Sequence, residues 1–376
     1  MAPLRAGLAL NLDHSLLQAA LPLLQSGQVG TVEWAFDTLS GQNPLPDWFE
    51  ALLDSYAEAD GLLGHGVFFS LFGGQWTTYQ AAWLRELARL SARYRLSHVT
   101  EHFGFMTGAD FHAGAPLSIP LTTTTLALGQ DRLKRIQQAC GCPVGLENLA
   151  FALTLDDVKR QGEFLDRLLD PINGCLILDL HNLYCQCENF GLTYQQLLAM
   201  YPLDRVRELH LSGGSWVMSS HEPGRNIRRD THDEAVPDAV FGGLELALAQ
   251  CRNLRFVLLE QLGNSLTTNQ ERTQYQTDFY RMNTLVTQHA QPPHPMNSFT
   301  PNLPLNLGTL PLENQLLHRQ QLDLSAILET STDTRQAQQL LVDSSLAHTD
   351  WNVENWQPSM LETAIAIARK WQKKQE

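Results

Sequence analysis

Short apolar runs alternate with longer amphipathic stretches along most of this chain. Each run has the length and residue types of a buried strand, and the stretches between them carry apolar residues at helical spacing. Eight such units over about 290 residues fit a closed (β/α)8 TIM barrel, an α/β fold for which roughly 250 residues are typical. An open doubly wound sheet is the alternative, but no G-x-G-x-x-G follows the first run. The predicted strands are Gly7–Leu10, Val32–Phe36, Leu62–Ser70, His98–Phe103, Val144–Asn148, Cys175–Leu180, Val206–Ser212 and Phe256–Gln261.

The composition changes after residue 290. Prolines crowd residues 291–312, which predicts a linker, and helical patterns follow without intervening strands. We therefore expect a barrel over residues 1–290 and a small helical C-terminal domain over 313–376. We expect this last segment to recognise a peptide or partner protein, with a stabilising or dimerising role as the alternative. The prolines are Pro292, Pro293, Pro295, Pro301, Pro304 and Pro311, and the predicted helices are Leu316–Thr330, Thr334–Val342 and Pro358–Lys373.

The net charge of −14 argues against a nucleic-acid partner, because such binding draws most of its affinity from Lys and Arg. No apolar run is long enough to cross a membrane, and the first residues lack the pattern of a secretory signal. Six cysteines without a C-x-x-C pair indicate reduced thiols. We expect a cytoplasmic protein that binds neither nucleic acid nor membrane.

Metal-ligand residue types stand at the ends of the predicted strands from the third onward. The C-terminal ends of barrel strands meet at one mouth, so these side chains should converge there. Buried carboxylates without Lys or Arg would cost several kcal/mol each unless cations neutralise them. Imidazole and carboxylate without thiolate suit zinc, iron or manganese. The residues are His65, His102, Glu147, Asp179, His210 and Glu260, with His181 and Asn182 just after the sixth strand and Asp230 and His232 in the loop after the seventh.

In their order these residues resemble the metal ligands of the xylose-isomerase-like barrels, which include trinuclear-zinc endonucleases that cut at abasic sites. The local motifs are closer to those of the DUF692 family of multinuclear non-heme iron-dependent oxidative enzymes, to which the methanobactin-biosynthesis oxidases belong. The resemblance covers roughly residues 5–265. Its motifs are Thr100-Glu101-His102-Phe103, Glu147-Asn148, Ile177-Leu178-Asp179-Leu180-His181-Asn182-Leu183-Tyr184, Asn189-Phe190-Gly191, His210-Leu211-Ser212-Gly213 and Asp230-Thr231-His232.

This resemblance implies a set of iron ligands and a reaction class. Asn182 favours the iron family, because the zinc endonucleases have a His there and a neutral amide leaves one ion more open. The family oxidises ribosomally made precursor peptides, commonly at cysteine, with two to three iron ions in mixed Fe(II)/Fe(III) states and dioxygen as co-substrate. A partner protein that recognises the peptide remains open. The implied ligands are His65, His102, Glu147, Asp179, Asn182, His210, Asp230, His232 and Glu260.

Two other functions fit the same ligand order. One is a zinc-dependent phosphodiesterase of the endonuclease type, and the other is a metal-dependent sugar isomerase or epimerase. Weaker signals surround the predicted site. Cys185 and Cys187 are interpreted as unreactive thiols, His14 as a surface residue, and Glu33 as either an orienting group or a salt-bridge partner. His181 is a competing ligand, and a basic cluster, Arg225-Asn226-Ile227-Arg228-Arg229, lies near the predicted mouth.

Overall fold

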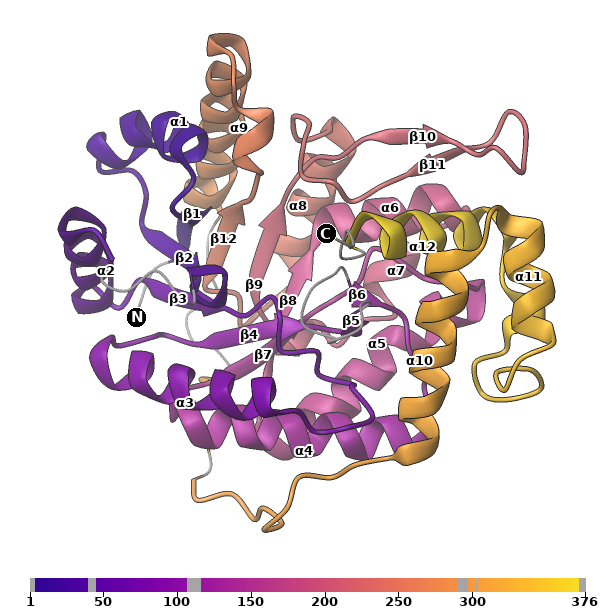
Figure 1. The fold of residues 1–376 in the computed structure, drawn as a ribbon. Coiled ribbons are helices and arrows are strands. Elements are labelled where there is room, and N and C mark those ends of the chain that lie inside the picture. The colour runs from indigo at the N-terminus through magenta and orange to yellow at the C-terminus, as the bar shows by residue number, and fades with distance from the viewer. Residues whose placement is uncertain (1–3, 40–44, 107–115, 290–296, 302, 372–376) are drawn as a thin grey trace.

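The computed structural model describes residues 4–39, 45–106, 116–289, 297–301 and 303–371. Eight parallel strands close into a barrel in the order β1-β12-β9-β8-β7-β4-β3-β2, which confirms the predicted (β/α)8 architecture (Figure 1). None of the described helices is both long and apolar enough to cross a membrane. Pro292, Pro293 and Pro295 of the predicted linker lie outside the described residues.

The barrel strands match the predicted runs, with some differences at their ends. The third strand was expected to reach Ser70 but ends at His65, because the next backbone N–H groups leave the sheet. Those of Val67 and Phe68 donate to Asp37 Oδ2, both at 2.9 Å. The strands are β1 Arg5–Leu10, β2 Thr31–Ala35, β3 Leu62–His65, β4 Val99–His102, β7 Val144–Glu147, β8 Cys175–Asp179, β9 Val206–Leu211 and β12 Phe256–Leu259.

Helices surround the barrel, and most begin at a side chain that caps them. Thr122, for example, accepts from the backbone N–H of Thr125 at 3.2 Å, so the helix after it begins at Thr123. Asp179 caps the helix that begins at Leu180, which ends β8 one residue earlier than predicted. The helices are α1 His14–Gln25, α2 Asp47–Glu58, α3 Thr78–Arg93, α4 Thr123–Cys140, α5 Leu155–Leu169, α6 Leu180–Phe190, α7 Tyr194–Leu198, α8 Asp238–Gln250 and α9 Asn269–Gln288.

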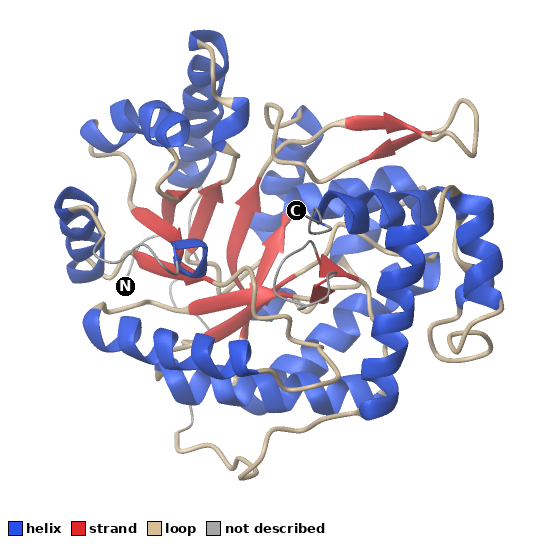
Figure 2. Cartoon of the chain, viewed as in Figure 1, coloured by secondary structure: helices blue, strands red, loops and turns tan. Residues whose placement is uncertain are grey.

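Two small antiparallel sheets stand apart from the barrel sheet and were not predicted (Figure 2). The first pairs β5, Phe105–Met106, with β6, Pro116–Leu117. The second pairs β10, Trp216–Met218, with β11, Asn226–Arg228. Both hairpins follow C-terminal ends of barrel strands, so they belong to the end of the barrel where the predicted ligands gather.

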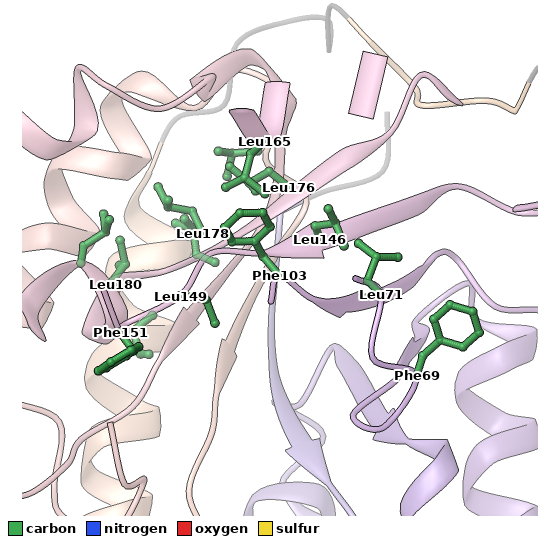
Figure 3. Close-up of a cluster of buried hydrophobic side chains, with 14 of the residues drawn as sticks. Phe69, Leu71, Phe103, Leu146, Leu149, Phe151, Leu165, Leu176, Leu178 and Leu180 are labelled. Carbon is green, nitrogen blue, oxygen red and sulfur yellow. The ribbon is translucent and has the colours of Figure 1, made fainter. Parts of the chain in front are cut away.

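The hydrophobic core lies between the barrel wall and its helices. Phe103, just after β4, Leu146 of β7, and Leu176 and Leu178 of β8 meet Leu165 of α5 there, all at most 2% exposed (Figure 3). The barrel interior holds a separate apolar cluster of Leu63, Phe256 and Leu258. Because side chains alternate along a strand, the residues two positions after Leu63 and Leu258 also face inward. Those residues are His65 and Glu260, so the polar site begins directly above this cluster.

Three further helices follow residue 312, as predicted. They are α10 Gln315–Thr330, α11 Thr334–Val342 and α12 Pro358–Trp371, and the predicted end at Lys373 lies outside the described residues. They pack against the barrel. Gln321 of α10 accepts from Gly74 N and donates to Phe72 O, each at 2.8 Å, and a Cβ at Gly74 would lie 2.4 Å from His318 N. The division of the chain at residues 290 and 312 stays a prediction.

Candidate metal centre

The predicted ligands converge at the C-terminal mouth of the barrel. A cavity of about 430 Å³ opens there. Asp179 and His210 are fully buried and do not line this cavity, but they share a donor cluster with two residues that do. The seven that line the cavity are His65, His102, Glu147, Asn182, Asp230, His232 and Glu260.

The first donor cluster joins His65, His102 and Glu147. Both imidazole Nε2 atoms lie 3.5 Å from Glu147 Oε2. Two ligands about 2.1 Å from one ion lie roughly 3.0–3.4 Å apart in octahedral or tetrahedral geometry. The observed separations are therefore close to those of ligands that share an ion.

Thr100 orients the imidazole of His65. The Thr100 hydroxyl donates to Gly64 O at 3.4 Å and lies 2.9 Å from His65 Nδ1. Since its hydrogen is directed to the carbonyl, the hydroxyl oxygen accepts from Nδ1–H. This tautomer leaves a lone pair on Nε2, directed toward Glu147, as a metal ligand requires.

The second donor cluster comprises Glu147, Asp179, His210 and Glu260, with one donor atom from each within 4.8 Å of the others. His210 Nδ1 lies 3.1 Å from Glu260 Oε2 and 3.9 Å from Glu147 Oε1. Asp179 Oδ1 accepts from the backbone N–H of Asn182. Glu147 belongs to both clusters and faces each of them with a different carboxylate oxygen. It therefore has the position of a bridging ligand.

Asp230, His232 and Asn182 lie beside these clusters. Asp230 Oδ1 lies 2.9 Å from His232 Nε2, and His232 Nδ1 lies 3.3 Å from Glu260 Oε1. The backbone φ of His232 is +52°, a conformation that non-glycine residues rarely adopt and that concentrates at functional sites. Asn182 Nδ2 donates to Asn148 O at 2.8 Å. The side-chain carbonyl oxygen of Asn182 therefore points to the opposite side of its amide group.

A third cluster, Glu33, Glu208 and His210, lies deeper in the barrel. His210 Nε2 is 3.2 Å from Glu208 Oε1 and 3.4 Å from Glu33 Oε1, and His98 Nε2 is 2.5 Å from Glu208 Oε2. Glu33 was predicted only as an orienting or salt-bridged group, and Glu208 was not predicted at all. Its signal in the sequence is its place two residues before His210, on the same face of β9.

His181 lies behind Asp230. Arg228 Nε donates to His181 Nε2 at 3.1 Å, so Nδ1 carries the hydrogen that points to Asp230 Oδ1 at 2.9 Å. Both ring nitrogens are thus engaged, and His181 orients Asp230. Cys185 Sγ is 3.9 Å from His181 Nδ1, and burial raises the pKa of its thiol well above the usual value. His14, at the start of α1, is exposed.

Buried acidic side chains crowd the site. Among the described residues, no Lys or Arg forms an ion pair with Glu33, Glu147 or Asp179. Burial, together with neighbouring acidic groups, raises the pKa of Glu33 to about 8 and of Asp179 to about 7, and it raises that of Glu147 well above its usual range. Protons therefore neutralise part of this charge, and cations that replaced them would do the same.

The buried imidazoles divide into two groups. Burial lowers the pKa of His65 and His102, so both are neutral near pH 7. For His210 burial also acts against the charged form, but Glu33, Glu208 and Glu260 outweigh it and raise the pKa well above 6.5. The first cluster therefore has free nitrogen lone pairs, whereas His210 must release a proton before its Nδ1 binds a cation.

A sequence model of the family described as RiPP precursor modification enzyme MbnB/TglH/ChrH matches residues 15–273. This match spans all nine predicted ligands and more than half of the chain. The chain belongs to this family. Its members modify the precursors of ribosomally synthesised peptides, so the family resemblance inferred from the motifs is confirmed. The barrel mouth carries groups of side chains that could hold metal ions.

Parts of the chain are also similar to individual proteins. A UPF0276 protein of Acaryochloris marina is 27% identical over 245 residues, which cover 61% of this chain and 85% of that protein. One of Chromobacterium violaceum is 33% identical over 193 residues, 51% of this chain and 66% of that protein. A xylose isomerase-like TIM barrel protein from Mycobacterium smegmatis in complex with magnesium has a TM-score of 0.47 at 14% identity, and the match covers 76% of this chain and 98% of that one.

Proposed function

We propose that this protein is an iron-dependent oxidase that uses dioxygen to modify a ribosomally synthesised precursor peptide, with cysteine as the target residue. The observation that carries the proposal is the position of Glu147, which joins two donor clusters at one cavity in a member of a precursor-modifying family. Nine nitrogen and oxygen donors exceed what one ion coordinates, so the proposed centre holds two to three irons in mixed Fe(II)/Fe(III) states.

The residues fit such a centre. Asp179 Oδ2 and Asn182 Oδ1 are buried, and no described donor reaches either atom. A buried acceptor without a partner costs roughly 1–3 kcal/mol, and a bound cation would remove that cost. The donors are imidazole, carboxylate and one amide, a set that suits iron better than calcium or a structural zinc. His65, His102 and Glu147 would hold one ion, and Glu147, Asp179, His210 and Glu260 a second.

Asn182, Asp230 and His232 are the residues proposed for a third ion. The amide of Asn182 is neutral and a weak donor, so a position beside it is the one that a substrate group would take most readily. Bound iron would supply the redox chemistry, with dioxygen as the acceptor of the electrons that leave the peptide. The chain itself would bind the peptide at the cavity, orient its reacting side chain toward the donor clusters and exclude water.

Other residues of the chain would fix the ligands in place. Thr100 selects the tautomer of His65, and His181, which accepts from Arg228, donates to Asp230 and orients it. Glu208 accepts from His210 Nε2 and directs Nδ1 of that ring toward Glu260 and Glu147. Hydrogen bonds of this kind orient metal-bound imidazoles and tune their basicity.

Metal analysis combined with oxygen uptake tests this function. Protein from cells supplied with iron, zinc and manganese together is expected to retain two to three irons per chain. It is then expected to consume dioxygen when synthetic cysteine-containing peptides are added, with a matching loss of mass from the peptide, and not with the same peptides carrying serine. Stoichiometric zinc without iron, and no activity after reconstitution with iron, would support a phosphodiesterase instead. Exchangeable magnesium, manganese or cobalt would support an isomerase.

A further inference from the structure

Helix α12 supplies one wall of the metal-centre cavity, although it follows the last proposed ligand by about a hundred residues. Met360, Thr363 and Ile367 line the same cavity as His65, His102 and Glu147. They are spaced by three and four residues, so they share one face of the helix. Figure 1 shows α12, in yellow, reaching toward the barrel, with the C-terminal mark beside its end.

Hydrogen bonds hold α12 in this place. The carboxylate of Glu362 accepts from Ser219 Oγ at 2.7 Å and from Ser220 N at 2.9 Å, both in the segment that follows β10. Gln357, just before the helix, donates its backbone N–H to Leu153 O at 3.1 Å and accepts from Arg225 at 3.1 Å. The wall is thus fixed to the loops after β7 and β9, which also carry cavity residues.

The cavity has two chemically different parts. The donor clusters supply its imidazoles and carboxylates, here called the floor. The other lining residues, here called the sides, include many apolar side chains together with polar ones such as Asn189, Arg228 and Gln261. Its volume of about 430 Å³ lies within the roughly 300–1,000 Å³ that is typical of small-ligand sites. Ions held by the floor would occupy only the polar part. The apolar residues of the sides include Leu10, Phe68, Leu149, Phe151, Leu262, Met360 and Ile367.

We propose that α12 and the facing apolar side chains form a subsite that holds an apolar side chain of the precursor peptide, next to the residue that is modified. This inference rests on the proposed function for the identity of the ligand. Continuity of the apolar sides with the donor clusters supports it, because a peptide whose reacting group reaches the floor must place its neighbouring residue against them. Ile367 is half-buried and packed against the core, so it is the α12 side chain best placed to contact that residue.

Hydroxamates of different chain length test the subsite, because their head group binds metal and their tail reports on the apolar sides. Binding of acetohydroxamate and octanohydroxamate is measured on the full chain, loaded with the metal that it retains on purification. Each methylene that leaves water tightens binding by up to about fourfold, so the longer compound is expected to bind at least about tenfold more tightly.

The variants separate the subsite from the metal centre. Ile367→Asp is expected to remove the advantage of the long tail and to leave acetohydroxamate binding and metal content within twofold of wild type. Ile367→Leu keeps the advantage, and Ile367→Thr, a milder change should the aspartate variant not fold, reduces it. Ala366→Asp is the matched control, because Ala366 is exposed, lies next to Ile367 on α12 and is not among the residues that line this cavity. It should behave as wild type.

Equal binding of the two hydroxamates to wild type, or an undiminished tail effect in Ile367→Asp and Ile367→Thr, would overturn the subsite and leave the metal centre standing. Failure of acetohydroxamate to bind, with no metal in the protein, would instead contradict the proposed function. In that case the apolar dye anilinonaphthalene sulfonate, which needs no metal, decides the subsite. Its fluorescence should rise with wild type and with Ala366→Asp, and an equal rise with Ile367→Asp would refute the inference.

Discussion

Glu147→Gln should separate the structural role of this side chain from its role toward metal. Without metal, burial raises the pKa of Glu147 well above its usual range, which favours the neutral, protonated carboxyl. Glutamine has the same shape and is also neutral. Its carbonyl can still accept from Asn182 Nδ2, which lies 3.3 Å from Glu147 Oε1, and its amide can donate to the neutral imidazole of His65 or His102. The metal-free variant should therefore lose only about 1 kcal/mol or less.

With metal the two proteins should differ strongly. An ion present at a hundred times its Kd stabilises the folded state by about 2.7 kcal/mol. Glu147 belongs to both of the first two donor clusters, so the variant should lose most of the stabilisation from two ions, about 5 kcal/mol. For a chain of this size that corresponds to a difference in Tm of roughly 5–10 °C.

Thermal unfolding with and without metal measures both effects. Each protein is stripped with a chelator and dialysed, and Tm is recorded before and after iron is added under reducing conditions. We expect similar Tm values without metal and a rise on iron addition in the wild type alone. An equal rise in both proteins would refute the bridging role of Glu147. A large loss of Tm in the metal-free variant would refute the argument that the carboxyl is neutral there.

Four further predictions concern the same centre. Metal affinity, measured by chelator competition, should increase from pH 6 to pH 8, because the raised pKa values of Glu147, Asp179 (to about 7) and His210 mean that cations must displace protons. A pH-independent affinity would contradict this. Asp179→Ala should lose metal and activity together by elemental analysis and turnover, whereas Cys185→Ser should retain both, since Cys185 belongs to none of the three donor clusters described above and its Sγ lies 3.9 Å from the His181 ring. Glu208→Gln should keep most of the metal but weaken its affinity by about 10–100-fold and shift its absorption spectrum, because it acts through His210. An unchanged spectrum would mean that Glu208 stabilises the fold but does not act on the metal.

The convergence of the predicted ligands at one mouth could be foreseen from the sequence because the barrel imposes a simple rule. Parallel strands place their last residues at one mouth, so a polar residue at the end of a buried run points to that mouth whichever strand carries it. His65, His102, Glu147 and Asp179 are each the last residue of their strand in the structure. The rule did not need correct strand lengths, since the strand predicted to reach Ser70 still contained His65 at its inner face.

The features that the sequence did not predict depend on tertiary contacts, which local sequence patterns do not encode. Glu208 stands within a strand and not at its end, so the strand-end rule does not reach it, although its spacing of two from His210 places both on the same face. The helical pattern of α12 was recognised, but the loops against which it packs were not, because those contacts join residues far apart in the chain. The β10–β11 hairpin was missed because each strand has only three residues, too few for an alternating pattern to be recognised.

Anomalous X-ray diffraction from crystals of the purified protein, recorded above and below the iron absorption edge, tests the central claim most directly. We expect two or three iron peaks at the barrel mouth, one between His65, His102 and Glu147 and another between Glu147, Asp179, His210 and Glu260. Peaks at the zinc edge alone, or iron bound elsewhere on the chain with these side chains paired only with one another, would contradict the account.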